Sequence, residues 1–336
     1  MNYIGSKYKL SAFLEDEIRA AVGGSLSDKV FCDMFAGTGV VGRIFKQHVK
    51  SVISNDIEDY SYVLNKNYIQ NYAQLQDNES YIKELNELLL REDGFIYNHY
   101  CLGSGSGRQY FSDENGKKID TIRLKIEELK RSKKIDDNMY YFLLASLIES
   151  ADKVANTASM YAAFLKTLKK PAQRKLVLEP AYFEQSHNGH VVYQEDSNSL
   201  IKKIKGDILY LDPPYNHRQY GANYHILNTI ALYDEFVPKG KTGIRVYNRS
   251  MYCKKNRAIK SFEELIRDAN FKYIFLSYNN EGIMSRDEVK SIMSKYGKYD
   301  LKIKEHKRFK ASNALSKKHK TDSTDEYLHI LQKDGF

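Results

Sequence analysis

The sequence contains no tryptophan and little cysteine, with three cysteines (Cys32, Cys101 and Cys253) among 336 residues. Their wide spacing fits no metal-binding motif, which argues for a reducing compartment without disulfides and against a metal site. No apolar run reaches the length of a membrane span, and charged side chains interrupt any signal-peptide pattern at the N-terminus. The sequence therefore predicts a cytoplasmic protein that makes no use of a membrane.

Basic side chains outnumber acidic ones, 52 to 43, which gives a net charge of +9. A polyanionic partner would account for this excess; the alternative is a lysine-rich surface without such a partner. The 27 tyrosines can stack on nucleic-acid bases or simply fill core and surface. The chain is long for one compact domain, so we expect a core domain with an inserted or appended lobe.

The stretch 208–215 reads Ile-Leu-Tyr-Leu-Asp-Pro-Pro-Tyr. Its apolar start predicts a buried strand, and the two prolines must end that strand because they lack an N–H and fix φ. Asp212 would then stand at the carboxyl end of a strand, where open α/β sheets bind ligands. A carboxylate, main-chain carbonyls and the Tyr215 ring together suit a planar base with an exocyclic amine. The alternative is a structural turn in which Asp212 is only a local cap.

A second strand-end feature lies near the N-terminus. A short strand at 29–33 leads into Phe35-Ala36-Gly37-Thr38-Gly39 and then a helix through Phe45. Glycines in such a turn let the backbone approach a ligand at a helix N-terminus. The next strand, 51–54, ends at Asn55-Asp56, and an acidic residue at this spacing commonly binds ribose hydroxyls. The Gly-x-Gly pattern by itself occurs in many turns.

The rest of the chain alternates between a sheet and a helical region. A helix is expected near 10–22, and helices near 80–91, 119–131 and 136–151 predict a mainly helical lobe over 61–185. Sheet strands are expected at 191–194, 273–277, 301–305 and 326–331, with Glu195-Asp196-Ser197 at the end of the first. Helices are expected near 224–233 and 261–269. Basic stretches lie at 238–257 and 307–320.

These motifs, in this order, resemble the Dam-like DNA adenine-N6 methyltransferases of the α group, in the subgroup found in restriction–modification systems. The resemblance rests on Asn-Tyr-Ile-Gly-Ser-Lys at 2–7, the Phe35–Gly39 turn, Asn55-Asp56, Asp196-Ser197 and the 212–215 turn, and it spans most of the chain. Ser197 stands where the family usually has phenylalanine. The loop 216–220 and the stretch 277–282 resemble the restriction–modification subgroup.

The resemblance implies a Rossmann-like methyltransferase sheet, mostly parallel with one antiparallel strand, formed by 1–60 and 186–336. The helical lobe 61–185 would be the target-recognition region. The implied reaction moves a methyl group from S-adenosylmethionine to N6 of an adenine flipped out of double-stranded DNA, with no metal. The implied partners are DNA and a cognate restriction endonuclease that need not touch the chain, which would act as a monomer.

The implied roles fall into three sets. The catalytic set is Asp212, Pro213, Pro214 and Tyr215. The set that binds the methyl donor is Tyr3, Ile4, Gly5, Lys7, Asp33, Phe35, Ala36, Gly37, Thr38, Gly39, Asn55, Asp56, Asp196 and Ser197. The set that contacts DNA is Arg218, Gln219, Tyr220, Arg245, Arg249 and Lys254.

Two other classes of function stay open from the residues alone. An RNA or protein-glutamine methyltransferase also uses an Asn/Asp-Pro-Pro-Tyr turn. A non-catalytic DNA-binding protein could retain the same scaffold, although the intact Gly37, Asp56, Asp212 and Tyr215 argue against it.

Overall fold

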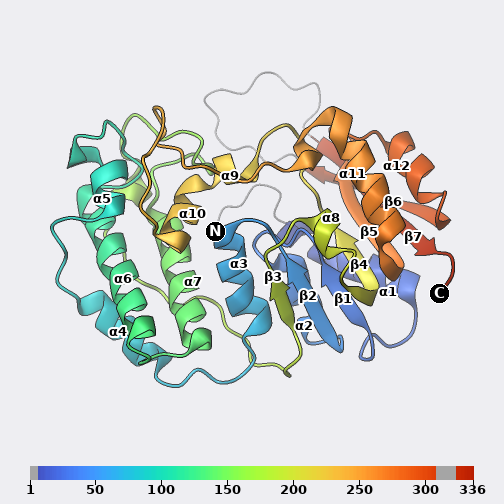
Figure 1. Cartoon of the computed structure of the whole chain (residues 1–336), viewed down its shortest axis with the longest axis horizontal. Coiled ribbons are helices and arrows are strands. Elements are labelled where there is room, and N and C mark those ends of the chain that lie inside the picture. The colour runs from blue at the N-terminus through green and yellow to red at the C-terminus, as the bar shows by residue number, and fades with distance from the viewer. Residues whose placement is uncertain (1–6, 308–322) are drawn as a thin grey trace. The chain divides into compact units, whose positions relative to one another are not determined.

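The computed structural model describes residues 7–307 and 323–336. In this part of the chain, seven strands form one sheet in the order β3-β2-β1-β4-β5-β7-β6 (Figure 1). The strands are β1 (Val30–Asp33), β2 (Ser51–Asn55), β3 (Val191–Tyr193), β4 (Lys205–Leu211), β5 (Asn270–Asn279), β6 (Gly297–Lys307) and β7 (Ser323–Lys333).

Strands β3, β2, β1, β4 and β5 are parallel, and β7 runs antiparallel to both β5 and β6. The register sets Cys32 of β1 beside Leu209 of β4. This arrangement confirms the predicted Rossmann-like sheet with one antiparallel strand. Five parallel strands end at the same edge of the sheet, so the residues that follow them gather there.

Among the described residues, the sheet belongs to a unit made of Lys7–Ile57, Gly189–Gln219 and the chain from Asn248 onward. Its helices are η1 (Lys7–Leu10), α1 (Ser11–Val22), α2 (Val40–Lys46), α8 (Ser197–Leu200), η5 (Met251–Cys253), α11 (Lys255–Asp268) and α12 (Arg286–Met293).

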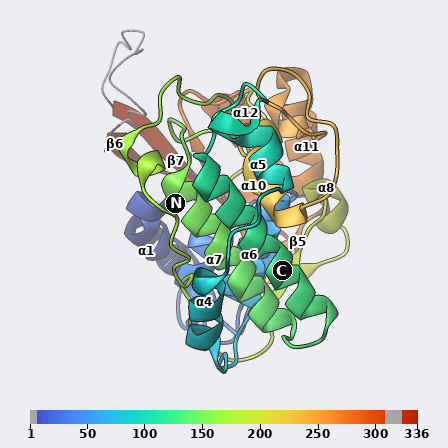
Figure 2. The same ribbon diagram turned by 90° about the vertical axis from the view of Figure 1, so that its left-hand side faces the viewer.

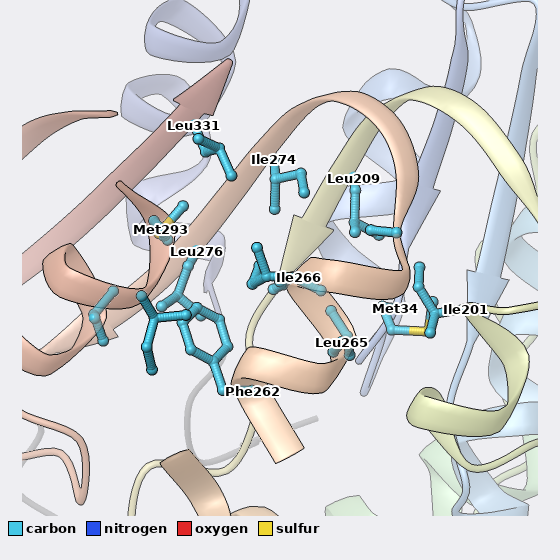
Figure 3. Packing of buried hydrophobic residues seen from close by; sticks show 14 of the residues in the cluster. Met34, Ile201, Leu209, Phe262, Leu265, Ile266, Ile274, Leu276, Met293 and Leu331 are labelled. Atoms are coloured by element: carbon cyan, nitrogen blue, oxygen red, sulfur yellow. The ribbon is translucent and has the colours of Figure 1, made fainter. Parts of the chain in front are cut away.

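Helix α11 covers the sheet through one apolar stripe, because Phe262, Leu265 and Ile266 recur at helical spacing and are fully buried. Figure 3 shows these side chains in one apolar cluster with Leu209 of β4 and with Ile274 and Leu276 of β5. Burying a side chain of this size contributes about 1.5–3 kcal/mol. The core therefore fixes the position of β4 and, with it, the turn that follows β4.

The second unit, Glu58–Asn188 and Tyr220–Tyr247, is helical. Helices α6 and α7 lie side by side in it (Figures 1 and 2). Ser112 and Asp136 cap their first turns by accepting from Asn115 N and Met139 N. The helices are α3 (Asp59–Asn65), η2 (Lys66–Gln70), α4 (Asn78–Glu87), α5 (Phe95–Tyr100), η3 (Leu102–Ser104), α6 (Asp113–Arg131), α7 (Asp137–Val154), η4 (Lys170–Gln173), α9 (Tyr220–Asn223) and α10 (His225–Leu232).

The helical unit includes one segment that the sequence grouped with the sheet, 220–247. Helix α10 buries Ile226, Leu227 and Ile230 in this unit. The Arg123 guanidinium of α6 donates to the carbonyl oxygens of Ile230 (3.0 Å) and Ala231 (3.1 Å) at the end of α10. The segment folds with the lobe because its apolar helix packs there, a long-range choice that local pattern does not reveal.

Helices α3, α5 and α12 were not predicted, since each is short and mixes polar with apolar residues. Helix α12 instead relies on a capping box in which Ser285 and Glu288 satisfy each other's backbone N–H groups. Among the described helices, none is both long and apolar enough to span a bilayer.

Candidate active site

One aspartate follows or closes each of four neighbouring parallel strands. Asp196 comes after β3, Asp56 after β2, Asp33 ends β1 and Asp212 follows β4. Because the carboxyl ends of these strands share one edge, the four carboxylates mark out a single row in the sheet unit. Such a row offers several hydrogen-bonding oxygens to a polar ligand at one edge of the sheet.

The Asp212–Tyr215 turn begins where β4 ends. Asp212 lies with its Oδ1 3.1 Å from the Lys7 ammonium, and 7% and 16% of the two side chains are exposed. Glu326 of β7 places its Oε2 4.0 Å from the same ammonium. Burial raises the pKa of Asp212 to about 6, the Lys7 cation works against that rise, and the Glu326 charge adds to it. Asp212 is therefore largely ionised at neutral pH.

Lys7 is the centre of this charge cluster. Burial alone would lower its pKa, but Asp212, Glu326 and Tyr215 raise the pKa above its ordinary value, so Lys7 stays a cation. Its ammonium also lies 5.9 Å from the centre of the Tyr215 ring. The sequence predicts that Lys7 binds the methyl donor; the structure places its ammonium beside the Asp212 carboxylate.

Tyr215 is held from two sides. Its carbonyl accepts from the Ile283 N–H at 3.0 Å, and its ring meets Tyr278 edge-on with centroids 6.3 Å apart. Gly282 has no room for a side chain, since a Cβ there would overlap the Tyr278 ring. In the described part of the chain no N–H donates to the Pro213 carbonyl, which leaves that oxygen available as an acceptor beside Asp212.

Phe35, Ala36, Gly37, Thr38 and Gly39 form the turn from β1 into α2. Gly37 and Gly39 have φ of 52° and 73°, a left-handed conformation that strains any residue with a Cβ. The Ala36 N–H donates to the Asn55 carbonyl (2.9 Å), and the Gly37 N–H donates to Asp56 Oδ2 (2.7 Å). The predicted glycine turn is thus tied to the end of β2 through Asp56.

Asp33 is almost completely buried beneath this turn. Its Oδ2 accepts from the Gly42 N–H at 3.1 Å, while its Oδ1 has no hydrogen-bond partner among the described residues. Burial raises the pKa of Asp33 to about 8; the Gly42 N–H opposes that rise, and the charges of Asp212 and Asp56 add to it. An unpaired buried oxygen of this kind is costly unless a ligand uses it.

Asn55 and Asp196, both predicted to bind the methyl donor, make hydrogen bonds within the carboxyl edge of the sheet. The Asn55 amide donates to the carbonyls of Met34 (3.2 Å) and Glu195 (3.1 Å) and accepts from the Glu195 N–H (3.0 Å). Asp196 caps α8 by accepting from the Ser199 N–H at 3.0 Å, and its side chain is exposed. Asn55 thereby locks the ends of β1, β2 and β3 together.

Ser197 is buried, and Tyr252, from a distant part of the sequence, reaches the neighbouring Asn198. The Tyr252 hydroxyl donates to Asn198 Oδ1 at 3.0 Å, and its ring meets Phe35 edge-on with centroids 5.2 Å apart. Tyr252 lies in a stretch that the sequence analysis noted only for its lysines and arginines.

Four of the residues predicted to contact DNA belong to the sheet unit. Gln219 is clasped to Ser250, donating to its carbonyl (3.3 Å) and accepting from its N–H (2.8 Å). Arg218, Arg249 and Lys254 have exposed side chains. These two hydrogen bonds hold the loop 216–219 beside the loop 248–254, so Arg218 and Lys254 project from neighbouring loops.

The other two predicted DNA contacts belong to the helical unit and have internal partners. Arg245 makes a bidentate pair with Asp234 (2.8 and 2.9 Å), stacks on Phe236 and is 9% exposed. The Tyr220 ring stacks on Tyr224 with centroids 6.1 Å apart. Both side chains are positioned to stabilise the fold of their unit.

Some predicted residues lie outside the described part of the chain: Tyr3, Ile4, Gly5 and most of the basic stretch 307–320. Within residues 7–307 and 323–336, no group of three or more His, Cys, Asp and Glu side chains is arranged to hold a metal ion.

Sequence reasoning missed Glu326, Tyr252 and the pairing of Lys7 with Asp212. Glu326 reaches the site only because β7 pairs with β5, where it faces Asn279. Nothing local to Glu326 signals that contact.

Residues 3–292 match the family model of D12 class N6 adenine-specific DNA methyltransferases. The chain belongs to this family. Membership confirms the resemblance drawn from the motifs and separates the chain from the RNA and protein-glutamine methyltransferases.

Curated relatives of this D12 methyltransferase agree with the assignment. It is 64% identical over 333 residues to the type II methyltransferase M.NlaIII of Neisseria lactamica, with 99% of each chain covered. It is 35% identical to M.CviAII of Paramecium bursaria Chlorella virus 1, with 98% of each covered. It is 38% identical to M.FokI of Planomicrobium okeanokoites, where 99% of this chain matches 53% of that protein. No solved structure shows significant similarity.

Proposed function

We propose that the chain transfers a methyl group from S-adenosylmethionine to N6 of an adenine flipped out of duplex DNA, as the modification enzyme of a type II restriction–modification system. The observation that carries the proposal is the Asp212 carboxylate, held ionised by Lys7 at 3.1 Å and followed at once by two prolines and an anchored tyrosine. Family membership supplies the substrate atom.

The residues predicted to bind the methyl donor lie at the carboxyl edge of the sheet and suit S-adenosylmethionine. Asp56 would accept from the ribose hydroxyls while keeping its bond to Gly37, and the left-handed Gly37 and Gly39 would let the chain approach closely. Asp196 would contact the adenine ring, with Phe35 and Tyr252 as its aromatic neighbours. The unpaired Asp33 Oδ1 offers one more hydrogen-bonding group at this edge. When bound, the molecule supplies an activated methyl group on a sulfonium.

Asp212 and the Pro213 carbonyl would accept the two hydrogens of the exocyclic amine. Adenine N6 is a poor nucleophile because its lone pair is delocalised into the ring. Two acceptors fixed by the Pro-Pro turn favour a pyramidal nitrogen whose lone pair is exposed. As N6 gains positive charge during transfer, the Asp212 carboxylate stabilises that charge. Lys7 orients the carboxylate, and the chain needs no separate base before transfer.

Tyr215 would stack on the flipped base. An adenine inside a duplex is stacked and cannot reach the turn, so it must be extruded. Stacking on an aromatic ring recovers about 1–3 kcal/mol of that cost. The Ile283 N–H and the Tyr278 ring keep Tyr215 in one orientation, which favours this use.

The relatives support the biological role. M.NlaIII and M.FokI are both named type II methyltransferases, and M.NlaIII aligns with this chain from end to end. A modification enzyme has to methylate one short sequence wherever it occurs in the genome.

The direct experiment is expression in a methylation-free bacterial host, followed by long-read sequencing that detects N6-methyladenine. We expect modification of one adenine in one short motif, and none with an Asp212→Ala chain. Methylated RNA or protein with unmodified DNA would overturn the proposal.

A further inference from the structure

Three loops of the helical unit meet around a buried cluster of aromatic side chains. They are 102–109, which precedes α6, 157–170, which follows α7, and 238–247. The Arg108 guanidinium donates to the Gly240 carbonyl (3.0 Å), and the Tyr100 hydroxyl donates to the Gly243 carbonyl (2.7 Å). The first bond ties loop 102–109 to loop 238–247, and the second ties the end of α5 to loop 238–247. Since α6 and α7 are antiparallel neighbours, the loops 102–109 and 157–170 lie at the same end of the pair (Figure 1).

Loop 157–170 is fixed to the first loop through the Leu165 carbonyl. That oxygen accepts from the side chains of Gln109 (2.6 Å) and Asn156 (3.0 Å). Asn156 also donates to the Gln109 carbonyl (3.0 Å) and accepts from the Lys169 N–H (3.0 Å). The Asn156 side chain is fully buried, and the bonds that close this loop are partly buried.

Two aromatic residues of the same loop act as anchors. The fully buried Tyr161 donates from its N–H to the Asn223 carbonyl (2.7 Å), and its own carbonyl accepts from the Tyr110 hydroxyl (2.8 Å). The Phe164 ring packs edge-on against Tyr110, with centroids 5.1 Å apart. Between these anchors, Ala162 and Ala163 are exposed. The result is a rigid loop that presents small side chains and its own backbone to solvent.

The stretch that contains the loop is basic in sequence, although the Tyr161 hydroxyl donates to the Asp152 carboxylate just before it (2.8 Å). From 153 to 178 the sequence has no aspartate or glutamate and contains Lys153, Lys166, Lys169, Lys170, Arg174 and Lys175. Lys153 and Lys175 pair with acidic residues outside this stretch, whereas Lys166, Lys170 and Arg174 are exposed and make no ion pair in the described part of the chain. Unpaired cations flanking a fixed backbone are what phosphate contacts require.

We propose that loop 157–170 is the element of this chain that reads the target sequence, with Lys166 and Lys170 on phosphates and the backbone around Ala162 and Ala163 against base edges in a groove. The inference rests on the proposed function and adds to it the residues that set specificity. Small residues are needed at 162 and 163 because a large side chain would hold the backbone away from the base edges. Rigidity matters as well, since a fixed loop loses little entropy on binding.

Two pairs of matched variants test the inference, with the motif first determined for the wild-type chain. Lys166→Glu is compared with Lys134→Glu; both lysines are exposed, and they lie beyond opposite ends of α7. Ala163→Trp is compared with Ala73→Trp, an exposed alanine two residues after Asn71, whose side chain donates to Asn138 at the other end of α7 (2.9 Å). Thermal unfolding and binding of S-adenosylmethionine verify that each variant is folded.

Lys166→Glu is expected to weaken binding to a duplex carrying the motif about tenfold or more, with a smaller dependence on salt. Ala163→Trp is expected to lower methylation of the motif about 10- to 100-fold, the size of a lost base contact, or to relax the motif at one position. Both controls should behave like the wild type.

Loop variants that match their controls would overturn the inference. If Lys166→Glu had an effect and Ala163→Trp had none, the loop would contact a phosphate without reading bases, and the inference would be overturned. A wild-type chain that methylates no DNA would instead overturn the proposed function, so the two failures are distinguishable.

Discussion

The Lys7 ammonium lies 3.1 Å from Asp212 Oδ1, with both side chains largely buried. Such a pair costs desolvation free energy, so its retention at a strand end suggests a task other than stability. Lys7 opens η1 near the N-terminus, whereas Asp212 follows β4, so the two residues are far apart in the sequence. Their contact keeps the carboxylate ionised and fixes the direction of its free oxygen.

Removing the cation should therefore shift the pH dependence of methyl transfer. Asp212 is active when ionised, so activity is present above its pKa of about 6 and is lost as the pH falls through that value. Lys7→Met removes the charge that lowers this pKa, and the acid limb of the pH–rate profile should move to higher pH. For each pH unit by which the acid limb moves, the rate of methyl transfer at a fixed pH below the new pKa should fall about tenfold. Lys7→Arg keeps the positive charge and should give a profile close to that of the wild type. If the profile of Lys7→Met did not move, Lys7 would not be the residue that lowers the pKa of Asp212.

Asp33 should make the free protein less stable as the pH rises. Its pKa is raised from 3.8 to about 8, so the folded chain holds a proton that unfolding releases. The free energy of unfolding then falls with increasing pH between about 4 and 8, by up to about 1.4 kcal/mol per pH unit for one proton. Asp212 and Asp120, each with a pKa of about 6, and the buried His225 and His329, each with a pKa lowered to about 4, affect the slope mostly below pH 7, so between pH 7 and 8 the slope belongs mainly to Asp33.

Asp33→Asn keeps an acceptor for the Gly42 N–H and cannot ionise. Urea unfolding of the free protein at pH 6, 7 and 8 should give a flatter dependence for this variant than for the wild type. Equal slopes in the two proteins would show that Asp33 is already ionised across this range.

Asp56 should act on the methyl donor through its charge and on the glycine turn through its hydrogen bond. Asp56→Asn can still accept from the Gly37 N–H, whereas Asp56→Ala leaves that donor without its 2.7 Å partner. We expect calorimetry to show weaker binding of S-adenosylmethionine in both variants, and weakest in Asp56→Ala. A hydrogen bond to a charged group is worth about 1.5–3 kcal/mol, or roughly 10- to 100-fold in affinity. If Asp56→Ala bound S-adenosylmethionine as tightly as the wild type does, Asp56 would not be part of the methyl-donor site.

Arg218 should contribute to DNA binding and Lys205 should not. Arg218 is exposed three residues after Tyr215, while Lys205 is exposed at the opposite end of β4. Arg218→Glu should weaken duplex binding and lower its salt dependence without changing the affinity for S-adenosylmethionine. Lys205→Glu is the matched control. It also replaces a basic side chain by an acidic one, although the residue replaced is a lysine and not an arginine. Equal effects of the two variants would mean that only net charge matters.

Local pattern was enough to predict the sheet and its strand-end motifs. The apolar run 208–211 with its prolines marked the end of β4, and the Gly37 and Gly39 spacing marked the turn before α2. Both signals are short-range, because turn chemistry and burial act on neighbouring residues.

Contacts between distant residues could not be predicted in this way. The Lys7–Asp212 pair, the approach of Glu326 along β7 and the folding of 220–247 with the helical unit all depend on tertiary packing. Arg245 shows the same limit, since its bidentate pair with Asp234 is invisible in a basic stretch read only for its charge. Charge in a sequence predicts a partner class better than it predicts which side chain makes the contact.

Single-turnover methyl transfer by Asp212→Ala tests the central claim most directly. Asp212 stabilises charge that develops on N6 during transfer, so its loss should lower the rate by about 100- to 1000-fold or more. The affinities for duplex DNA and for S-adenosylmethionine, measured on the same preparation, should change little, because the lost interaction strengthens only in the transition state. Methylation of adenine by Asp212→Ala at close to the wild-type rate would contradict the account.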